Sequence, residues 1–174
     1  MPVNLIVDTD MSIDVDDVGA LCAAHALADL GEAKLLAVIH DTALPEGAGA
    51  ISVINNFYGR DHLRIGAYSG NIGDPSKTPE PAWTSNGEGE YVHDLVETFK
   101  GSRVRTARDA ERAVDVYRET LAATWEPHSI TIAAIGHTTA LLELLQSPAD
   151  DVGPSGIELV QQKVRQVSVA GFEP

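Results

Sequence analysis

The chain has 174 residues, of which 44% are hydrophobic and 22% are charged, a composition typical of a globular protein with one core. Its formal net charge of -14 argues against nucleic acid and anionic membranes as partners. The single cysteine excludes an internal disulfide and a thiolate metal site, and because the chain has neither an apolar run that could span a bilayer nor a signal peptide, we expect a cytoplasmic protein.

Short runs of β-forming residues alternate with helical patterns along the whole chain. The predicted strands are residues 3–7, 34–39, 63–67, 129–135 and 164–169. The predicted helices are residues 17–30, 45–58, 91–99, 107–123, 138–146 and 156–163. Residues 69–89 are rich in Gly, Pro, Ser and Asn and predict a long loop. This order predicts an α/β fold with a doubly wound, mainly parallel, Rossmann-like sheet and helices on both faces.

Five aspartates follow the first predicted strand within a short stretch. They are Asp8, Asp10, Asp14, Asp16 and Asp17. They lie at the carboxyl end of a strand and in the turn that opens a helix, where open α/β sheets bind their ligands. Capping of the helix accounts for one or two of them. The others repel one another unless a hard cation or a proton neutralises them, so the pattern predicts a metal or catalytic cluster.

Polar and aromatic side chains elsewhere are weaker candidates. Asp41 and Thr42 follow the second predicted strand, so they reach the same edge of the sheet, where they either contact a ligand or form an ordinary polar turn. His137 follows the fourth strand, and a lone histidine at a helix start is more often a cap or a surface group than a ligand contact. Trp83 and Tyr91 flank the long loop and either stack on a flat ligand or, more commonly, anchor the loop.

Three segments resemble the inosine–uridine-preferring nucleoside hydrolase family. Residues 8–10 are Asp-Thr-Asp, residues 14–17 are Asp-Val-Asp-Asp, and Val-Gly-Ala-Leu follows, as in the family's first strand and helix. Residues 136–141, Gly-His-Thr-Thr-Ala-Leu, resemble the family's Gly-Pro-Leu-Thr-Asn segment, and residues 163–171 resemble the strand that ends in Met-Gly-Gly. The resemblance covers this chain and about the amino-terminal half of a typical member.

The resemblance implies calcium-dependent hydrolysis of the N-glycosidic bond of a ribonucleoside, giving ribose and free base. Asp10, Asp17 and the backbone carbonyl of Thr139 would be the Ca²⁺ ligands. The general base would be Asp16, with Asp14 as the alternative. The predicted contacts to the nucleoside are Asp8, Asp41, Thr42 and His137. The partner is therefore a small molecule, with a homo-oligomer as a further possibility.

Two alternatives remain open at this stage. The family's last metal-binding aspartate would lie beyond residue 174, so we expect residues 1–174 to form a single domain of this kind that lacks its carboxyl-terminal part. A catalytically inactive fragment that binds calcium and ribose is therefore the alternative function. A phosphatase of the haloacid dehalogenase type is a minor one, with Asp8 as the nucleophile of an Asp-x-Asp motif. That motif leaves the pair Asp16 and Asp17 unexplained.

Overall fold

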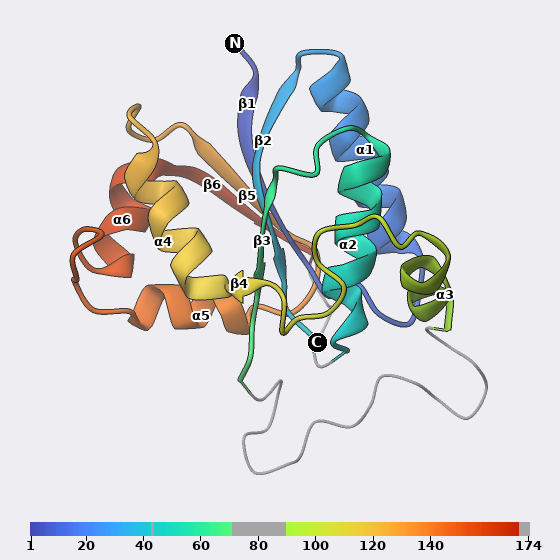
Figure 1. The fold of residues 1–174 in the computed structure, drawn as a ribbon. Coiled ribbons are helices and arrows are strands. Elements are labelled where there is room, and N and C mark those ends of the chain that lie inside the picture. Colours follow the sequence, from blue (N-terminus) through green and yellow to red (C-terminus); the bar gives the residue numbers. More distant parts are fainter. Residues whose placement is uncertain (43, 71–89, 171–174) are drawn as a thin grey trace.

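A computed structural model describes residues 1–42, 44–70 and 90–170 of the chain. Its centre is a six-stranded sheet in the order β4-β3-β2-β1-β5-β6 (Figure 1), and every pairing between neighbours is parallel. The strands are β1 (Val3–Thr9), β2 (Ala33–His40), β3 (Arg64–Ala67), β4 (Glu111–Arg112), β5 (Ile130–Ala134) and β6 (Val164–Val169). The strand order reverses between β1 and β5, which makes their carboxyl ends the expected ligand crevice.

Helices cover both faces of the sheet, as the sequence predicted. In Figure 1, one side of the sheet carries α1 (Asp16–Asp29), α2 (Glu46–Phe57) and α3 (Glu90–Thr98), and the other carries α4 (Ala113–Ala123), α5 (Thr139–Gln146) and α6 (Gly156–Lys163). Each side has its own apolar core, the first around Leu21, Val38 and Ile51 and the second around Ile132 and Tyr117. The central strands are almost continuously apolar because both of their faces are covered.

The close fit of α2 on its neighbours follows from its small residues. Gly47, Ala48, Gly49 and Ala50 are all buried. A Cβ atom at Gly49 would lie 2.1 Å from the carbonyl oxygen of Arg105, so only glycine permits this approach. The small residues that weaken α2 as an isolated helix therefore allow it to pack closely in the protein.

One predicted element is partly wrong. The helix expected over residues 107–123 begins at Ala113, and the two residues before it form the short edge strand β4 beside β3. The Arg64 side chain binds both carboxylate oxygens of Glu111, at 3.0 and 2.5 Å, and so ties β4 to β3. A strand of two residues is too short to show a periodic pattern in the sequence, and its partner strand lies far away along the chain.

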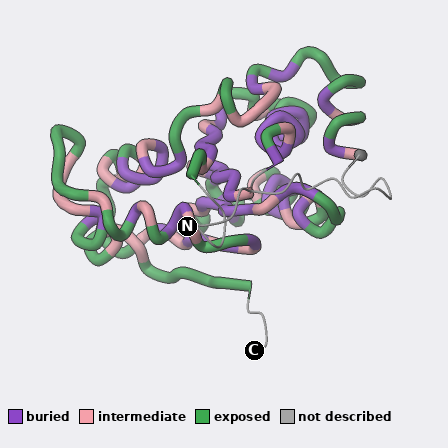
Figure 2. The backbone as a smooth tube through the Cα atoms, turned by 90° about the horizontal axis from the view of Figure 1, so that it is seen from below, coloured by how far each residue is buried: buried purple, intermediate pink, exposed green. Residues whose placement is uncertain are grey.

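The opposite edge of the sheet is open. Five of the six residues of β6 are exposed, including Val167 at 41% and Val169 at 51% (Figure 2). Among the residues that the structure describes, β6 pairs with β5 on one side and with no strand on the other. Within the described ranges, no helix has both the length and the apolar composition that a membrane span requires.

Candidate metal and ligand site

The acidic residues gather where β1, β2 and β5 end. The parallel ladder aligns Asp8 of β1 with Ile39 of β2 and Ala134 of β5. Beyond the strands, the Asp41 amide donates to the Thr9 carbonyl at 2.9 Å, and the Ile135 amide donates to the Asp8 carbonyl at 2.8 Å. These bonds hold the three strand ends together, so the residues that follow them share one edge of the sheet.

Three of the predicted acids form a compact group at the start of α1. One carboxylate oxygen from each of Asp14, Asp16 and Asp17 lies within 4.8 Å of the other two. Asp14 and Asp16 are exposed, whereas Asp17 is buried. Oxygen atoms at this separation could hold a metal ion, and an all-oxygen set suits a hard cation such as Ca²⁺ or Mg²⁺. Asp10 lies outside this group but is close enough to raise the pKa of Asp17.

Asp17 is the buried member of this group of three carboxylates. It is 1% exposed, and the Thr9 hydroxyl donates a hydrogen bond to its Oδ1 atom. Its Oδ2 atom is buried and accepts no hydrogen bond from the described residues. Burial, followed by the charges of Asp10, Asp16 and Asp14, raises the pKa of Asp17 to about 7. A cation at Oδ2 would supply the compensation that a buried carboxylate requires.

Asp8 lies beneath the cluster and is completely buried. The hydroxyl group of Tyr117, on α4, donates to its Oδ2 atom at 2.5 Å, and its Oδ1 atom is a second buried oxygen with no partner in the described ranges. Burial raises the pKa of Asp8 well above its ordinary value. Tyr117 comes from the opposite side of the sheet to α1, and no motif in the sequence marks it as part of the site.

Asp41 joins the site to the start of α5. Its Oδ2 atom accepts a hydrogen bond from the Ala140 amide at 2.7 Å, while the residue that precedes the helix, Thr138, supplies no side-chain cap. A carboxylate at this position satisfies a free helical amide and suits the positive end of the helix dipole. Burial nevertheless raises the pKa of Asp41, and its Oδ1 atom is buried with no partner among the residues described. The neighbouring Thr42 is half-buried, and Thr139 is the first residue of α5.

Asp10 and His137 lie side by side at the carboxyl ends of the strands. The His137 Nε2 atom lies 3.7 Å from Asp10 Oδ2, and their side chains are 43% and 27% exposed. Burial raises the pKa of Asp10, and the nearby imidazole partly offsets this effect. His137 is therefore a neighbour of the acidic cluster as well as a residue of the turn before α5.

Gly136 makes the approach of the β5–α5 turn to Asp10 possible. A Cβ atom built on Gly136 would lie 2.5 Å from both Cγ and the amide nitrogen of Asp10. We expect Gly136→Ala to displace Asp10. If Asp10 is a ligand of a calcium ion, as the family resemblance implies, the variant should bind calcium roughly tenfold more weakly, because a misplaced ligand forfeits most of its interaction with a cation. Calcium titration calorimetry measures the effect. Gly153→Ala is the control, since its Cβ would meet only ordinary contacts, and equal affinities in both variants would contradict the expectation.

Tyr91 of α3 fixes the acidic turn from outside. Its hydroxyl group donates to the backbone carbonyl of Asp14 and lies 3.5 Å from the sulfur of Met11. The contact joins Tyr91 to the acidic turn, whereas its predicted role as an anchor of the long loop is not tested, because Trp83 and most of that loop, residues 71–89, lie outside the described residues.

Removal of this anchor provides a test of its role. We expect Tyr91→Phe to destabilise the fold by about 1 kcal/mol, the usual net value of one hydrogen bond, and to weaken calcium binding several-fold because the turn becomes less ordered. Urea denaturation and calcium titration of the same samples measure the two effects. Tyr68→Phe, at the end of β3, serves as the control tyrosine. An unchanged calcium affinity for Tyr91→Phe would show that the turn is ordered without this contact.

Comparisons with known proteins bear on the fold. No family model matches the chain, and no curated protein matches it. Among solved structures, the type III effector XopQ complexed with adenosine diphosphate ribose matches with a TM-score of 0.71 at 17% identity, and the effector XOO4466 with 0.68 at 19%. The matches cover all of this chain but only 44% and 45% of those chains. Both effectors have the nucleoside hydrolase fold, and this chain shares the architecture of about half of it.

Proposed function

We propose that the acidic crevice binds a calcium ion and, through it, the ribose of a nucleoside-type ligand. The supporting observation is the buried Oδ2 atom of Asp17, which has no partner among the described residues and lies in a group of carboxylates that could hold a metal ion. Asp8 and Asp41 each have a further buried oxygen of this kind at the same ends of the strands. Buried charges of one sign are costly unless a counter-ion compensates them. Calcium accepts about six to eight oxygen ligands in flexible geometry, which matches carboxylates of unequal depth.

The proposed ligands are Asp10, Asp17 and the backbone carbonyl of Thr139. Asp14 and Asp16 stand beside Asp17 and face solvent, so they are free to act on a substrate or on water. His137, Asp41 and Thr42 are the proposed contacts to the sugar. The complete burial of Asp8 behind Tyr117 suits an inner carboxylate that supports the site and reaches no solvent.

The proposed reaction is hydrolysis of an N-glycosidic bond. A water oxygen bonds to the anomeric carbon as the bond to the base nitrogen breaks, and the base keeps that electron pair and takes up a proton. Asp16, or Asp14 in its place, accepts the proton from the water. Bound calcium would polarise the water and orient the ribose hydroxyls, and the surrounding carboxylates would stabilise the positive charge of the oxocarbenium-like transition state.

Binding without turnover is the second candidate. The effector XopQ was solved in complex with adenosine diphosphate ribose, a ligand that contains ribose, and this chain spans less than half of that protein. A ribose-binding function therefore has support that does not depend on catalysis. The phosphatase alternative loses support, because its nucleophile would be the fully buried Asp8, which could not reach a phosphorus atom.

The two candidates are separated by one pair of measurements. Ribose release from inosine and from uridine is assayed at high protein concentration with calcium or with a chelator, and calorimetry measures binding of calcium, ribose and adenosine diphosphate ribose. Ribose release that requires calcium supports the hydrolase. Calcium and ribose binding without release supports the binding function. Absence of calcium binding would overturn the proposal in both forms.

Calcium affinity should depend on pH in a defined direction. Asp17 has a pKa of about 7, so below that pH calcium must displace a proton and its affinity should fall, by up to roughly tenfold per pH unit for each proton released. Above that pH the affinity should level off. Calorimetry in two buffers of different ionisation enthalpy counts the released protons. A calcium affinity that stays constant from weakly acid to weakly alkaline pH would show that Asp17 is not a ligand.

A further inference from the structure

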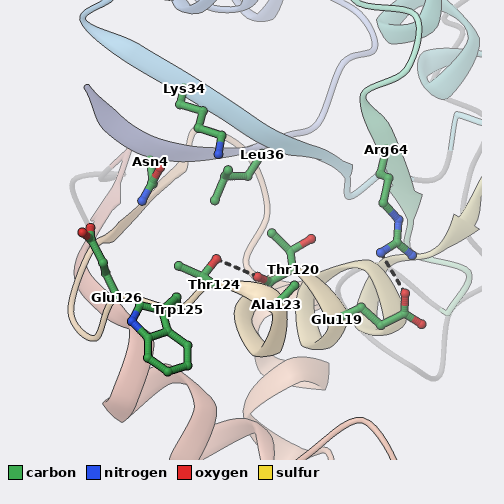
Figure 3. A pocket seen from close by; sticks show the side chains of 10 residues that line it. All are labelled: Asn4, Lys34, Leu36, Arg64, Glu119, Thr120, Ala123, Thr124, Trp125 and Glu126. Atoms are coloured by element: carbon green, nitrogen blue, oxygen red, sulfur yellow. Dashed lines mark hydrogen bonds and ion pairs between the residues drawn. The ribbon is translucent and has the colours of Figure 1, made fainter. Parts of the chain in front are cut away.

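A second hollow lies at the other end of the strands from the acidic crevice. It has a volume of about 500 Å³, which is large enough for a small molecule. The amino-terminal parts of β1, β2 and β3 form one wall, and the end of α4 with the residues after it forms the other (Figure 3). Asn4 and Lys34 are neighbours in the β1–β2 register, and in Figure 3 both extend from the strands toward the end of α4.

Some of the charged side chains that line this hollow form ion pairs within the protein, and others do not. The Arg64 guanidinium is bound by Glu111 at 2.5 Å and by Glu119 at 2.8 Å, so its charge is compensated within the protein. Lys34 and Glu126, which also line the hollow, form no ion pair within the described part of the chain. The hollow therefore offers one free cation and one free carboxylate from those residues.

Trp125 stands at the rim of the hollow, beside Glu126. It is 92% exposed, although tryptophan is usually well buried because its side chain is large and apolar. Leu36 and Ala123 add further apolar surface, and Figure 3 places the indole ring beside Thr124 at the end of α4. An exposed aromatic ring next to unpaired charges is typical of a recognition surface, because the ring contributes contact area at little entropic cost.

We propose that this hollow binds a small zwitterion of the α-amino acid type that carries a flat apolar side chain. The ligand's carboxylate is bound by Lys34, its ammonium group by Glu126, and its side chain stacks on Trp125. The hydroxyl groups of Thr120 and Thr124 line the same space and complete the polar part of the surface. This inference does not rest on the proposed calcium site, which lies at the carboxyl ends of the strands.

The test uses L-phenylalanine with two analogues, phenylpropionate, which lacks the ammonium group, and phenethylamine, which lacks the carboxylate. The chain has two tryptophans, so in a Trp83→Phe background the indole fluorescence reports on Trp125. Titrations are made in a chelator, which keeps the acidic crevice free of calcium, and calorimetry on the same samples provides a second readout. We expect saturable binding of L-phenylalanine, with each analogue weaker by roughly tenfold or more, the value of a lost charge-assisted hydrogen bond.

Three variants assign the contacts. Lys34→Gln should weaken L-phenylalanine and phenylpropionate but leave phenethylamine unchanged, and Glu126→Gln should do the reverse. Trp125→Ala, measured by calorimetry, should weaken all three ligands. Phe57→Ala is the matched control, because Phe57 is also an exposed aromatic residue, at 80%, but lies on α2 away from the hollow. The proposal is overturned if L-phenylalanine does not bind, if phenylpropionate binds equally well, or if Lys34→Gln weakens all ligands alike.

Discussion

Replacement of Asp10 by alanine is expected to lower calcium-dependent ribose release by roughly a thousandfold or more, because a loss of several kcal/mol of metal-assisted stabilisation has that effect on rate. Asp10 is the proposed ligand that faces both sides of the crevice. It lies near the charges of Asp14 and Asp16 on one side and 3.7 Å from His137 on the other. Its removal therefore takes away a proposed ligand and also the acidic neighbour of His137.

The matched control for this variant is Glu32→Ala. Glu32 is exposed and follows α1, far along the helix from the acidic turn, so the variant loses the same charge outside the site. Ribose release and calcium affinity are measured for both variants. Asp16→Asn and Asp14→Asn belong in the same series. Loss of the proposed base should lower turnover while calcium binding is largely kept. Undiminished release by Asp10→Ala would show that the metal ligands lie elsewhere.

Replacement of Asp17 by asparagine should have two effects of opposite sign. Calcium binding should be lost, since Asp17 is the proposed buried ligand. The metal-free protein should become more stable above pH 7, because the variant is not charged. With its pKa raised to about 7, Asp17 favours the folded state most when it is protonated, and this contribution is lost as the pH rises from about 4 through 7. The difference should be a few kcal/mol, at about 1.4 kcal/mol per pKa unit.

Urea denaturation at pH 5 and pH 8, with calcium or with a chelator, measures both effects. In chelator the variant should be more stable than the parent protein by a small margin at pH 5 and by a larger margin at pH 8. Calcium should stabilise the parent protein and leave the variant unchanged. Asp16→Asn is the control for a change of charge at an exposed position of the same turn. A variant that is less stable than the parent in chelator at pH 8 would mean that the charge of Asp17 is compensated within the protein.

Most of the architecture could be predicted from the sequence, because the signals for most elements lie within single segments of the chain. The apolar runs of β1, β2 and β5 and the small residues of α1 and α2 each specify their element within one segment. Because parallel strands end at a common edge, the positions of Asp10, Asp41 and His137 after their strands also predicted that they would meet. The structure brings all three to the acidic crevice.

The missed features depend on partners that are distant in the chain. Tyr117 is separated from Asp8 by 109 residues, and Tyr91 from Asp14 by 77. Tyr91 was a candidate from the sequence, and only its contact with the acidic turn was missed. Nothing in the pattern around Tyr117 marks it as polar in function, because it also occupies an ordinary position of an amphipathic helix. The strand β4 was missed for the same reason, since it forms through its pairing with the distant strand β3. A scan for tyrosines on predicted helices that face a predicted acidic cluster would have found the two side chains.

The bond between Asp41 and the Ala140 amide has a consequence for hydrogen exchange. That amide begins α5, where backbone N–H groups usually exchange with solvent quickly, yet here a buried carboxylate from the neighbouring β2 end holds it. Deuterium can enter only when α5 and the end of β2 separate. The exchange rate of this single proton therefore reports how often the bond between Asp41 and the start of α5 breaks, and slower exchange in calcium would show that the ion stabilises this contact.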